Sequence, residues 1–565
     1  MKDNMSTRDR VWPWIEGLLF ATVVLIVISL GGESLRTSYH GLLHTSIGEA
    51  VLRDGLLPEN PYHAGSQLSY YTLYPSLGVL LGKLGGGPLW GFALLNIFAA
   101  LLMGPALDSV GRRLGLCHMA RRFAFWSMIL GFNAFGYWCA RGVPVPPLGA
   151  MPMLILEPLT NVFGLTSFDA RLQSFTAKFL NVSSFACSLP FMLFALSNAL
   201  RDAKRSNFVA ACLLGLCVAI NPLVGAFATL LIVSQAMLVD GVRKQLIVWS
   251  KLGIVSALIA LPFLLPLVLQ SGHEQNEQPQ LPFVGDGALQ NVIGPNLLLL
   301  VLAAASFAKL NSRPKKVLAA AIVLALLFSF SHLPFGNEYK FPRLLAIFLA
   351  LPAGNFFIGI TKRHFRWAVL TLLVIVALPT TFVTARAYSF WNVEQSLTLR
   401  ESPNGNLIPR DDSAGLPSEV ISAIGGLDSD VVLMMNPRHP GAASIGLGSQ
   451  GNQWAPVLGR TLFVDKPQIH NQAHMSEVRR RLDMSIGFWS NKRWPAKPDS
   501  AVYISSQALE DARLEIAGRP LAIVSLAGHR ATHDALEQHS DATLVSRQGD
   551  VCLWLFSAAP KADEN

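Results

Sequence analysis

The chain has 565 residues, of which 51% are hydrophobic and only 14% are charged, and its mean hydropathy is +0.40. Soluble domains carry about 25% charged residues, so this composition excludes an ordinary soluble protein. The formal net charge of +9 comes from lysines and arginines that flank apolar segments. A nucleic-acid partner is therefore not needed to explain the basic character, and we predict none.

Apolar runs of about 18 or more residues recur through the first two-thirds of the chain, and each can cross a bilayer as a helix. We predict about eleven transmembrane helices. The apolar stretch 207–239 is too long for one crossing, and Asn221-Pro222 predicts a break in it because proline lacks a backbone donor. The predicted spans are residues 12–31, 87–107, 123–141, 182–200, 207–222, 224–239, 247–270, 294–310, 317–334, 344–360 and 367–386.

Lysines and arginines gather in alternate loops, for example at Arg112-Arg113 and Lys315-Lys316. Positively charged loops stay on the cytoplasmic side of a bacterial-type inner membrane. The pattern predicts a cytoplasmic N-terminus and an extracytoplasmic C-terminal end. A basic flank followed by the first span, without a convincing cleavage site, favours a retained signal anchor.

Three long segments, 32–86, 142–181 and 271–293, are predicted on the outer side, and long ordered loops on one face indicate a functional site there. Residues 387–565 are more polar, and their apolar runs shorten to strand length. We therefore predict a mainly α, polytopic helical membrane domain over 1–386 and an extracytoplasmic α/β domain over 387–565.

Short apolar runs of buried-strand type and helical stretches alternate in this C-terminal domain. Gln548-Gly549-Asp550 predicts a hairpin turn between the last two strands. The domain has no glycine-rich nucleotide signature, and its single cysteine, Cys552, cannot form an internal disulfide. The predicted strands are 431–435, 501–504, 521–525, 543–547 and 551–556, and the predicted helices are 473–484 and 507–515.

The densest group of polar residues lies in the first external segment. Residues 40–54 place their apolar side chains in one stripe, which predicts an amphipathic helix lying at the membrane interface and ending at Gly55. A solvated helix face explains any one polar residue here, whereas the density of the group favours a polar cavity. Without a defined third ligand, no metal site is predicted. The candidate residues are His40, His44, Glu49, Asp54, Glu59, His63, Tyr70 and Tyr71.

The run from Tyr39 to Pro75 combines this helix with a Pro58-Glu59-Asn60-Pro61 loop and a Tyr70-Tyr71-Thr72-Leu73-Tyr74-Pro75 sequence. It resembles the first periplasmic loop of the GT-C fold glycosyltransferases and their uncharacterised relatives, and residues 337–341 before a later span are similar too. The resemblance implies a helix-rich membrane core and, often, an external C-terminal domain. It also implies transfer of a sugar from a polyprenyl-phosphate carrier.

One position departs from that resemblance, because the family usually has an acid early in this loop where the chain has His40. The acid would act as the general base on the acceptor hydroxyl or bind a divalent cation, so the need for a metal stays open. His40, Asp54, Glu59 or Glu49 would have to supply the base. We expect Asp54 or Glu59 before Glu49, because an ion pair with Arg53 one turn away explains Glu49 fully.

A lipid-linked phosphate needs fixed cations, and two further segments offer them. Arg171 and Lys178 would share one face of a helix, with Glu157 and Asp169 nearby. The second segment carries Glu338, Lys340 and Arg343. The alternative for Arg171 and Lys178 is that they anchor the chain at the membrane surface by snorkelling, and the alternative for Glu338 and Arg343 is a structural ion pair. Because all three groups are predicted on one side of the membrane, we expect a shared polar cavity. The candidates are Asp169, Arg171, Lys178, Glu338, Lys340 and Arg343.

Trp454, Trp489 and Trp494 in the C-terminal domain are candidates for stacking on sugars, or core and membrane-contact residues. The leading hypothesis is a membrane glycosyltransferase that moves a sugar from a polyprenyl phosphate to an extracytoplasmic glycan or other acceptor. Two alternatives are a non-catalytic scaffold of an envelope polysaccharide complex, favoured by the missing early acid, and a lipid or polysaccharide transporter.

Overall fold

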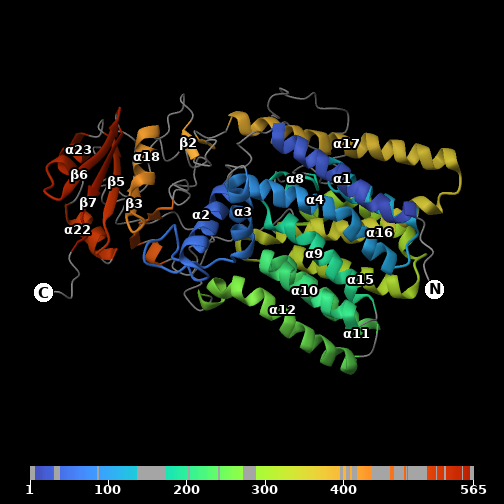
Figure 1. Cartoon of the computed structure of the whole chain (residues 1–565). Coiled ribbons are helices and arrows are strands. Elements are labelled where there is room, and N and C mark those ends of the chain that lie inside the picture. The colour runs from blue at the N-terminus through green and yellow to red at the C-terminus, as the bar shows by residue number, and fades with distance from the viewer. Residues whose placement is uncertain are drawn as a thin grey trace. The chain divides into compact units, whose positions relative to one another are not determined.

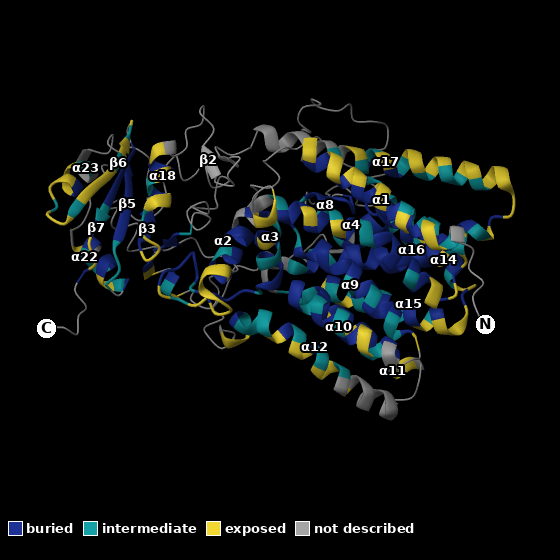
Figure 2. Ribbon diagram, in the orientation of Figure 1, coloured by how far each residue is buried: buried dark blue, intermediate teal, exposed yellow. Residues whose placement is uncertain are grey.

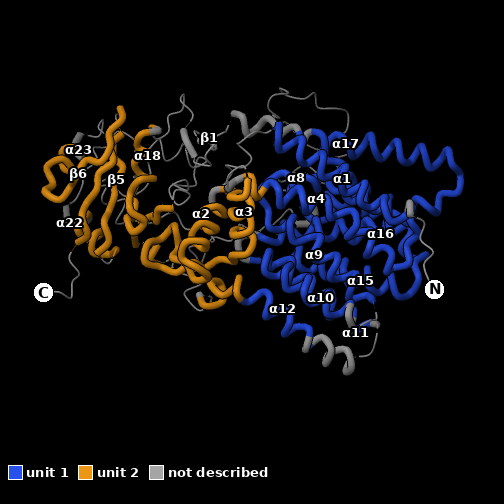
Figure 3. Tube along the Cα trace, in the orientation of Figure 1, with its two compact units in different colours: residues 1–35, 93–261, 278–394 blue, residues 36–92, 262–277, 395–565 orange. Residues whose placement is uncertain are grey.

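The computed structural model of the chain, shown in Figure 1, divides into two compact units, which Figure 3 colours separately. The first unit contains Met1–Leu35, Ala93–Leu261 and Gln278–Glu394, and the second contains Arg36–Phe92, Pro262–Glu277 and Gln395–Asn565. The structure describes residues 7–30, 39–85, 88–136, 174–201, 204–239, 242–270, 288–331, 333–394, 399–401, 407–409, 417–435, 459–463, 476–478, 480–481, 506–516, 518–526, 530–549 and 551–559.

Each of the predicted spans overlaps a helix, although the helix in the span 123–141 ends at Gly131 and its residues 137–141 lie outside the described residues. Together they account for most of the first unit, whose other described elements are the short helices α8 (Ala177–Leu180) and α13 (Ala288–Ile293) and the 3-10 turns η3 (Gly294–Asn296) and η4 (Pro334–Lys340). The helices are α1 (Thr7–Leu30), α4 (Pro88–Arg113), α5 (His118–Gly131), α9 (Ser184–Ala199), α10 (Lys204–Ile220), α11 (Pro222–Val239), α12 (Val242–Gln270), α14 (Leu297–Phe307), α15 (Ser312–Phe330), α16 (Phe341–Gly359) and α17 (Arg363–Glu394).

Five helical stretches in the described parts of the chain are long and apolar enough to cross a bilayer by themselves. Four of the remaining predicted spans match shorter apolar helices. The fold class predicted from the sequence, a polytopic helical membrane protein, is therefore confirmed. The five stretches are Asp9–Leu30, Trp90–Arg113, Leu252–Leu269, Asn337–Gly359 and Arg363–Phe382.

Helix α16 forms the centre of the first unit and packs against α5, α14 and α15. It is buried along most of its length, whereas α12 and α17 carry many exposed apolar side chains (Figure 2). A helix satisfies its own backbone hydrogen bonds, so such apolar surfaces can face lipid without cost. The distribution of exposed apolar side chains therefore distinguishes α16, which packs against protein, from α12 and α17, whose apolar surfaces suit contact with lipid.

The predicted break at Asn221 lies between α10 and α11. The Asn221 side-chain oxygen accepts a hydrogen bond from the Val224 N–H at 3.1 Å, which caps the first turn of α11, and its amide donates to Ser184 Oγ at 3.0 Å. Pro222 occupies the first helical position, where its missing N–H is not needed. The sequence signal and the observed helix start thus have the same cause.

In several places in the first unit, a lysine or arginine side chain donates a hydrogen bond to a backbone carbonyl close to the end of a helix. The last carbonyls of a helix lack intrahelical donors and carry the negative end of its dipole, so a cationic donor satisfies both. The donors and acceptors are Arg121 Nη1 to Leu116 O at 2.6 Å, Arg313 Nη2 to Leu200 O at 3.2 Å, Lys315 Nζ to Ala308 O at 3.2 Å and Arg366 Nη2 to Ile360 O at 2.6 Å.

The second unit contains a five-stranded mixed sheet in the order β4-β3-β5-β7-β6. Strands β4, β3 and β5 are mutually parallel, and β7 pairs antiparallel with both β5 and β6. The predicted hairpin is present, with Gly549 at φ +59° in the turn. The strands are β3 (Val432–Met435), β4 (Thr461–Leu462), β5 (Leu521–Leu526), β6 (Ala542–Gln548) and β7 (Val551–Phe556); β1 (Leu399–Glu401) and β2 (Leu407–Pro409) form a separate pair.

Helices cover both faces of the sheet. Helices α22 (Ser506–Glu515) and α23 (Arg530–Glu537) bury Leu509 and Leu536 against one face. On the other face, α18 (Ser418–Gly426) buries Val420, Ile421 and Ile424. Strand residues alternate between the two cores, as expected for a period of two. The predicted strand at 501–504 and most of the predicted helix at 473–484 lie outside the described residues.

The second face of the sheet is completed by a helix from far earlier in the chain. Helix α2 (Tyr39–Asp54) turns Leu43, Ile47 and Val51 into the same core as Leu433 and Val524 of the sheet. The amphipathic helix was predicted correctly, but its assignment to the membrane interface is wrong, because its apolar stripe is buried in protein. The second unit is thus not confined to the chain after residue 386. It also contains α3 (Leu73–Leu84), which packs on α2.

Replacement of Ile47 by alanine tests this packing. Ile47 is 0% exposed, so Ile47→Ala should lower the free energy of unfolding of the second unit by about 2–5 kcal/mol. Leu52→Ala on the same helix removes a side chain that is 43% exposed and serves as the control. The measurement is thermal unfolding of the purified protein, and equal melting temperatures for the two variants would contradict the assigned core.

Candidate functional site

His44 lies in a pocket of aromatic rings in the second unit. The imidazole is 3% exposed, and its ring centroid lies 5.0 Å from that of Tyr74, 5.7 Å from that of Tyr70 and 5.9 Å from that of Phe92. Tyr70 and Tyr71 stack at 4.3 Å with their hydroxyls 3.0 Å apart. These side chains pack α2 against α3, so a mainly structural role explains His44.

The acids of α2 have partners other than those expected. Glu49 accepts a hydrogen bond from Lys83 Nζ at 2.8 Å, so the predicted Glu49–Arg53 pair is wrong. Arg53 instead holds its neighbour Asp54 with two hydrogen bonds of 2.7 Å. Hydrogen bonding to Asp54 raises the pKa of the Arg53 guanidinium above its ordinary value. Asp54 is about one-third exposed, which leaves it open to solvent.

Glu59 is the most heavily engaged of the candidate acids. Its Oε1 accepts the Gly65 N–H at 2.7 Å and forms an ion pair with Arg519, and its Oε2 lies 3.4 Å from Thr461 Oγ1. His63, four residues further on, is 2% exposed. The helix from which this loop departs ends at Gly55, as predicted, with φ +88°. The side chain of His40, on the first turn of α2, lies outside the described residues.

In the first unit, two of the predicted groups meet around Tyr339. Lys178 Nζ donates to the Tyr339 hydroxyl at 3.2 Å and lies 4.5 Å from its ring centroid. Lys340 Nζ lies 5.8 Å from the same centroid. Residues 178 and 340 are far apart in sequence, so the fold brings two cations to one aromatic ring. The predicted shared helix face of Arg171 and Lys178 cannot be placed, because Arg171 lies outside the described residues, and the described chain begins there with a non-helical Ser174.

Two charged side chains are buried next to this pair. Arg343 is 1% exposed, with its guanidinium carbon 5.1 Å from the Phe132 ring centroid, and Glu338 is 0% exposed and accepts the Leu333 N–H at 3.3 Å. Both belong to the candidate span Asn337–Gly359. Charges inside a membrane span are costly, so they mark functional sites by default.

An apolar cavity of about 240 Å³ lies in the same unit. Helices α5, α14, α16 and α17 line it, with Gly131 directly preceding the Phe132 that contacts Arg343. Along α17 the lining ends at Ala377, and the next turns carry Thr380, which donates to Ala134 O at 3.2 Å, and Thr384, which accepts from the Ser174 N–H at 3.3 Å. The cavity is therefore lined almost entirely by apolar side chains, and polar side chains follow its lining along α17.

Sequence reasoning missed three contributors to this site. Tyr339 was noted only as part of a motif, and Phe132 and Thr384 carry no sequence signal, since an aromatic ring or threonine in an apolar helix is ordinary. Glu157, Asp169, Arg171 and the three candidate tryptophans of the C-terminal domain lie outside the described residues. Among the residues that the structure describes, no three histidine, cysteine or acidic side chains converge as a metal-binding group.

These features define an integral membrane protein with a helical core, a mixed α/β unit, a cationic cluster around Tyr339 and an apolar cavity. The sequence matches no protein-family model and no curated protein. The fold, however, has similar solved structures.

The chain is similar to ArnT from Cupriavidus metallidurans bound to undecaprenyl phosphate, with 14% identity, 96% of this chain and 99% of that chain covered, and a TM-score of 0.48. It is also similar to the arabinofuranosyltransferase AftD from Mycobacteria, with 14% identity and a TM-score of 0.55. That match covers 99% of this chain but only 42% of AftD. The shared fold with AftD confirms the GT-C architecture that the sequence predicted.

Proposed function

We propose that the protein transfers a sugar from a polyprenyl-phosphate donor to an extracytoplasmic glycan or other acceptor during envelope assembly. The observation that carries this proposal is that the helical unit holds both an apolar cavity and a set of cations, with Lys178 and Lys340 around Tyr339 and Arg343 against Phe132. A donor of this class has the same two parts, a long hydrocarbon chain and an anionic phosphate.

The donor phosphate would be held by cations of different kinds. Arg343 offers a planar fork for two phosphate oxygens, while Lys178 and Lys340 act as point charges beside Tyr339. In a low-dielectric membrane interior these charges interact more strongly with an anion than they would in water. Fixed cations also stabilise the negative charge that develops on the phosphate as it leaves.

Transfer would proceed by direct displacement. An acceptor hydroxyl attacks the anomeric carbon, the bond from that carbon to the phosphate oxygen breaks, and the phosphate departs with the electron pair. A base removes the hydroxyl proton, and the configuration at the anomeric carbon inverts. We assign the base to Asp54, which is partly exposed at the end of α2, with Glu49 and His40 as the other candidates from the first external segment.

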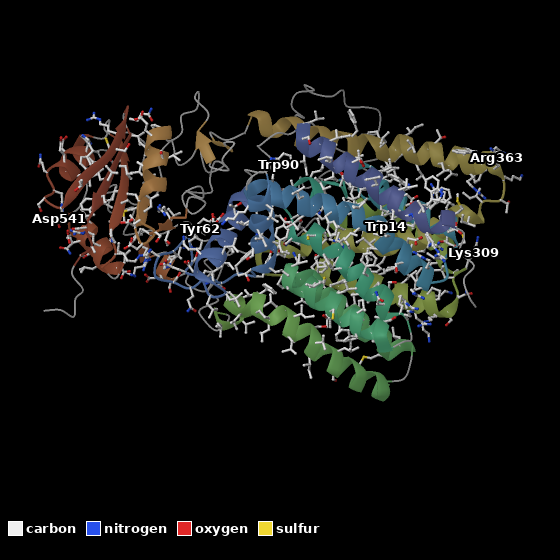
Figure 4. All side chains as sticks on the ribbon, in the orientation of Figure 1. Trp14, Tyr62, Trp90, Lys309, Arg363 and Asp541 are labelled. Atoms are coloured by element: carbon white, nitrogen blue, oxygen red, sulfur yellow. The ribbon has the colours of Figure 1, made fainter. Side chains whose placement is uncertain are left out.

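We further propose an inner-membrane protein with a cytoplasmic N-terminus and residues 387–565 outside the cytoplasm. Basic residues at the ends of separate helices support this orientation. Lys309 and Arg363 lie at the same end of the helical unit, as Figure 4 shows. Positive charge on one side is the pattern of a cytoplasmic face.

One observation favours a second candidate function. Glu49, Asp54 and Glu59 each pair with a lysine or arginine of their own unit. A protein whose first-loop carboxylates are all structural would serve as a non-catalytic GT-C scaffold in a polysaccharide complex, and this is the alternative that activity measurements decide.

The cationic cluster should control binding of the donor lipid. Lys178→Met or Lys340→Met removes a charge-assisted contact worth about 1.5–3 kcal/mol, so each should weaken the binding of a polyprenyl phosphate by about 10- to 100-fold. Lys309→Met, an exposed lysine elsewhere in the same unit, is the matched control. Affinity can be measured with the purified protein in lipid nanodiscs, and equal affinities for all three variants would exclude this cluster as the phosphate site.

The base should be revealed by amide substitution. Asp54→Asn should lower the turnover of sugar transfer by about 10²- to 10⁴-fold with little change in folding, since a general base contributes that much. Asp534→Asn, an exposed acid of α23, is the control. The series includes Glu49→Gln and His40→Ala. Loss only in His40→Ala would move the role to the histidine, and near-normal turnover in every variant would refute a base from the first external segment. No measurable turnover by the unmodified protein would support the scaffold.

Reporter fusions test the orientation. Alkaline phosphatase is active only outside the cytoplasm, so fusions at Arg113, Lys204 and Lys315 should be inactive and a fusion at Asn565 should be active. The opposite result at any of these four positions would overturn the proposed topology.

A further inference from the structure

The loop from Pro58 to Leu68 is closed by its own hydrogen bonds. Backbone bonds join Asn60 N to Ser66 O at 2.8 Å and Leu68 N to Pro58 O at 3.1 Å, and the Asn60 side chain accepts the Tyr62 N–H at 3.0 Å. Residues Glu59 and Gln67 form an isolated β-bridge. The loop is therefore a compact segment held together by its own hydrogen bonds.

This segment is bonded to the edge of the C-terminal sheet. The Leu462 N–H donates to Pro61 O and the Ala64 N–H donates to Leu462 O, both at 2.9 Å, and Arg481 Nη1 donates to Ala64 O at 2.6 Å. Strand β4 is the last in the sheet order, so its outer groups would otherwise face solvent. The loop thus acts as a cover for this edge.

Two arginines connect the same sheet to the candidate acids. Arg519, just before β5, pairs with Glu59 and also donates from Nε to Asp430 O at 2.7 Å, next to β3. Arg53, which holds Asp54, donates from Nη1 to Gly459 O at 2.9 Å, two residues before β4. Both connections run between the first external segment and the sheet.

We propose that Arg519 is a positioning residue, and that Glu59 is its anchor in the first external segment and not the base. Through this pair the C-terminal domain fixes the loop, and through Arg53 it orients Asp54. The inference rests on the proposed function for its catalytic consequence, but the anchoring itself does not. A base must reach the acceptor hydroxyl, whereas the Glu59 carboxylate is already used by Gly65, Arg519 and Thr461.

A charge exchange separates an anchor from a base. Glu59→Gln and Arg519→Gln should each lower kcat by about 10- to 100-fold with the donor KM unchanged, because misplacement of a catalytic group by about 1 Å costs that much. Their effects should not add, since both remove one interaction. The double variant Glu59→Arg with Arg519→Glu restores an ion pair and should recover most of the activity. Arg519→Lys should recover part of it.

Arg547→Gln, an exposed arginine on β6, is the control for loss of positive charge. If Glu59 is the base, the exchanged pair stays inactive and Arg519→Gln acts like Arg547→Gln. Either result overturns the proposal.

A second readout needs no substrate and keeps this test separate from the proposed function. Limited proteolysis of the purified full chain should cut the loop 58–68 faster in Glu59→Gln and Arg519→Gln than in the unmodified protein or in Arg547→Gln, and the exchanged pair should restore protection. Unchanged cleavage in both single variants would exclude the anchor, even if no transfer activity were found. Altered cleavage with no transfer by the unmodified protein or by any variant would leave the anchor in place and refute the transferase.

Discussion

The sheet of the second unit has an apolar face that α18 covers in part, among the described residues after 386. Helix α2 supplies the remainder, and burying Leu43, Ile47 and Val51 there removes three apolar side chains from water. The loop 58–68 follows directly from this packing, because it leaves α2 beside the sheet edge to which it bonds. The candidate acids are thus held by the hydrophobic core of a domain encoded several hundred residues later.

Much of the architecture could be predicted from local patterns. Helix positions, the break at Asn221, the end of α2 at Gly55 and the hairpin before β7 each follow from a short stretch of sequence. The covering of the α2 stripe could not be predicted, since an amphipathic helix fits a membrane surface and a protein sheet equally well. The Lys178–Tyr339 contact also required the fold, because no local signal links residues 161 positions apart.

Choosing partners for the charged residues was the weakest part of the sequence reasoning. Spacing suggested Glu49 with Arg53, yet Lys83 of the neighbouring helix takes Glu49 and frees Arg53 to hold Asp54. Helix spacing identifies only pairs on the same helix, which contribute little, and packing between helices decides the rest. Glu59, one of the two acids expected first as the base, is engaged by residues of the C-terminal domain.

The cations that cap helix ends in the helical unit have two separate effects: each donates a hydrogen bond to a helix end, and each adds a positive charge that influences orientation in the membrane. A hydrogen-bond donor is enough to end a helix, so glutamine or asparagine could satisfy the same carbonyls. Only a charge opposes passage across the membrane during insertion. The two roles can drift apart in evolution. An amide in place of Arg313 or Arg366 would preserve the helix boundary but would no longer favour one orientation of the protein in the membrane. The remaining cations would then have to determine that orientation.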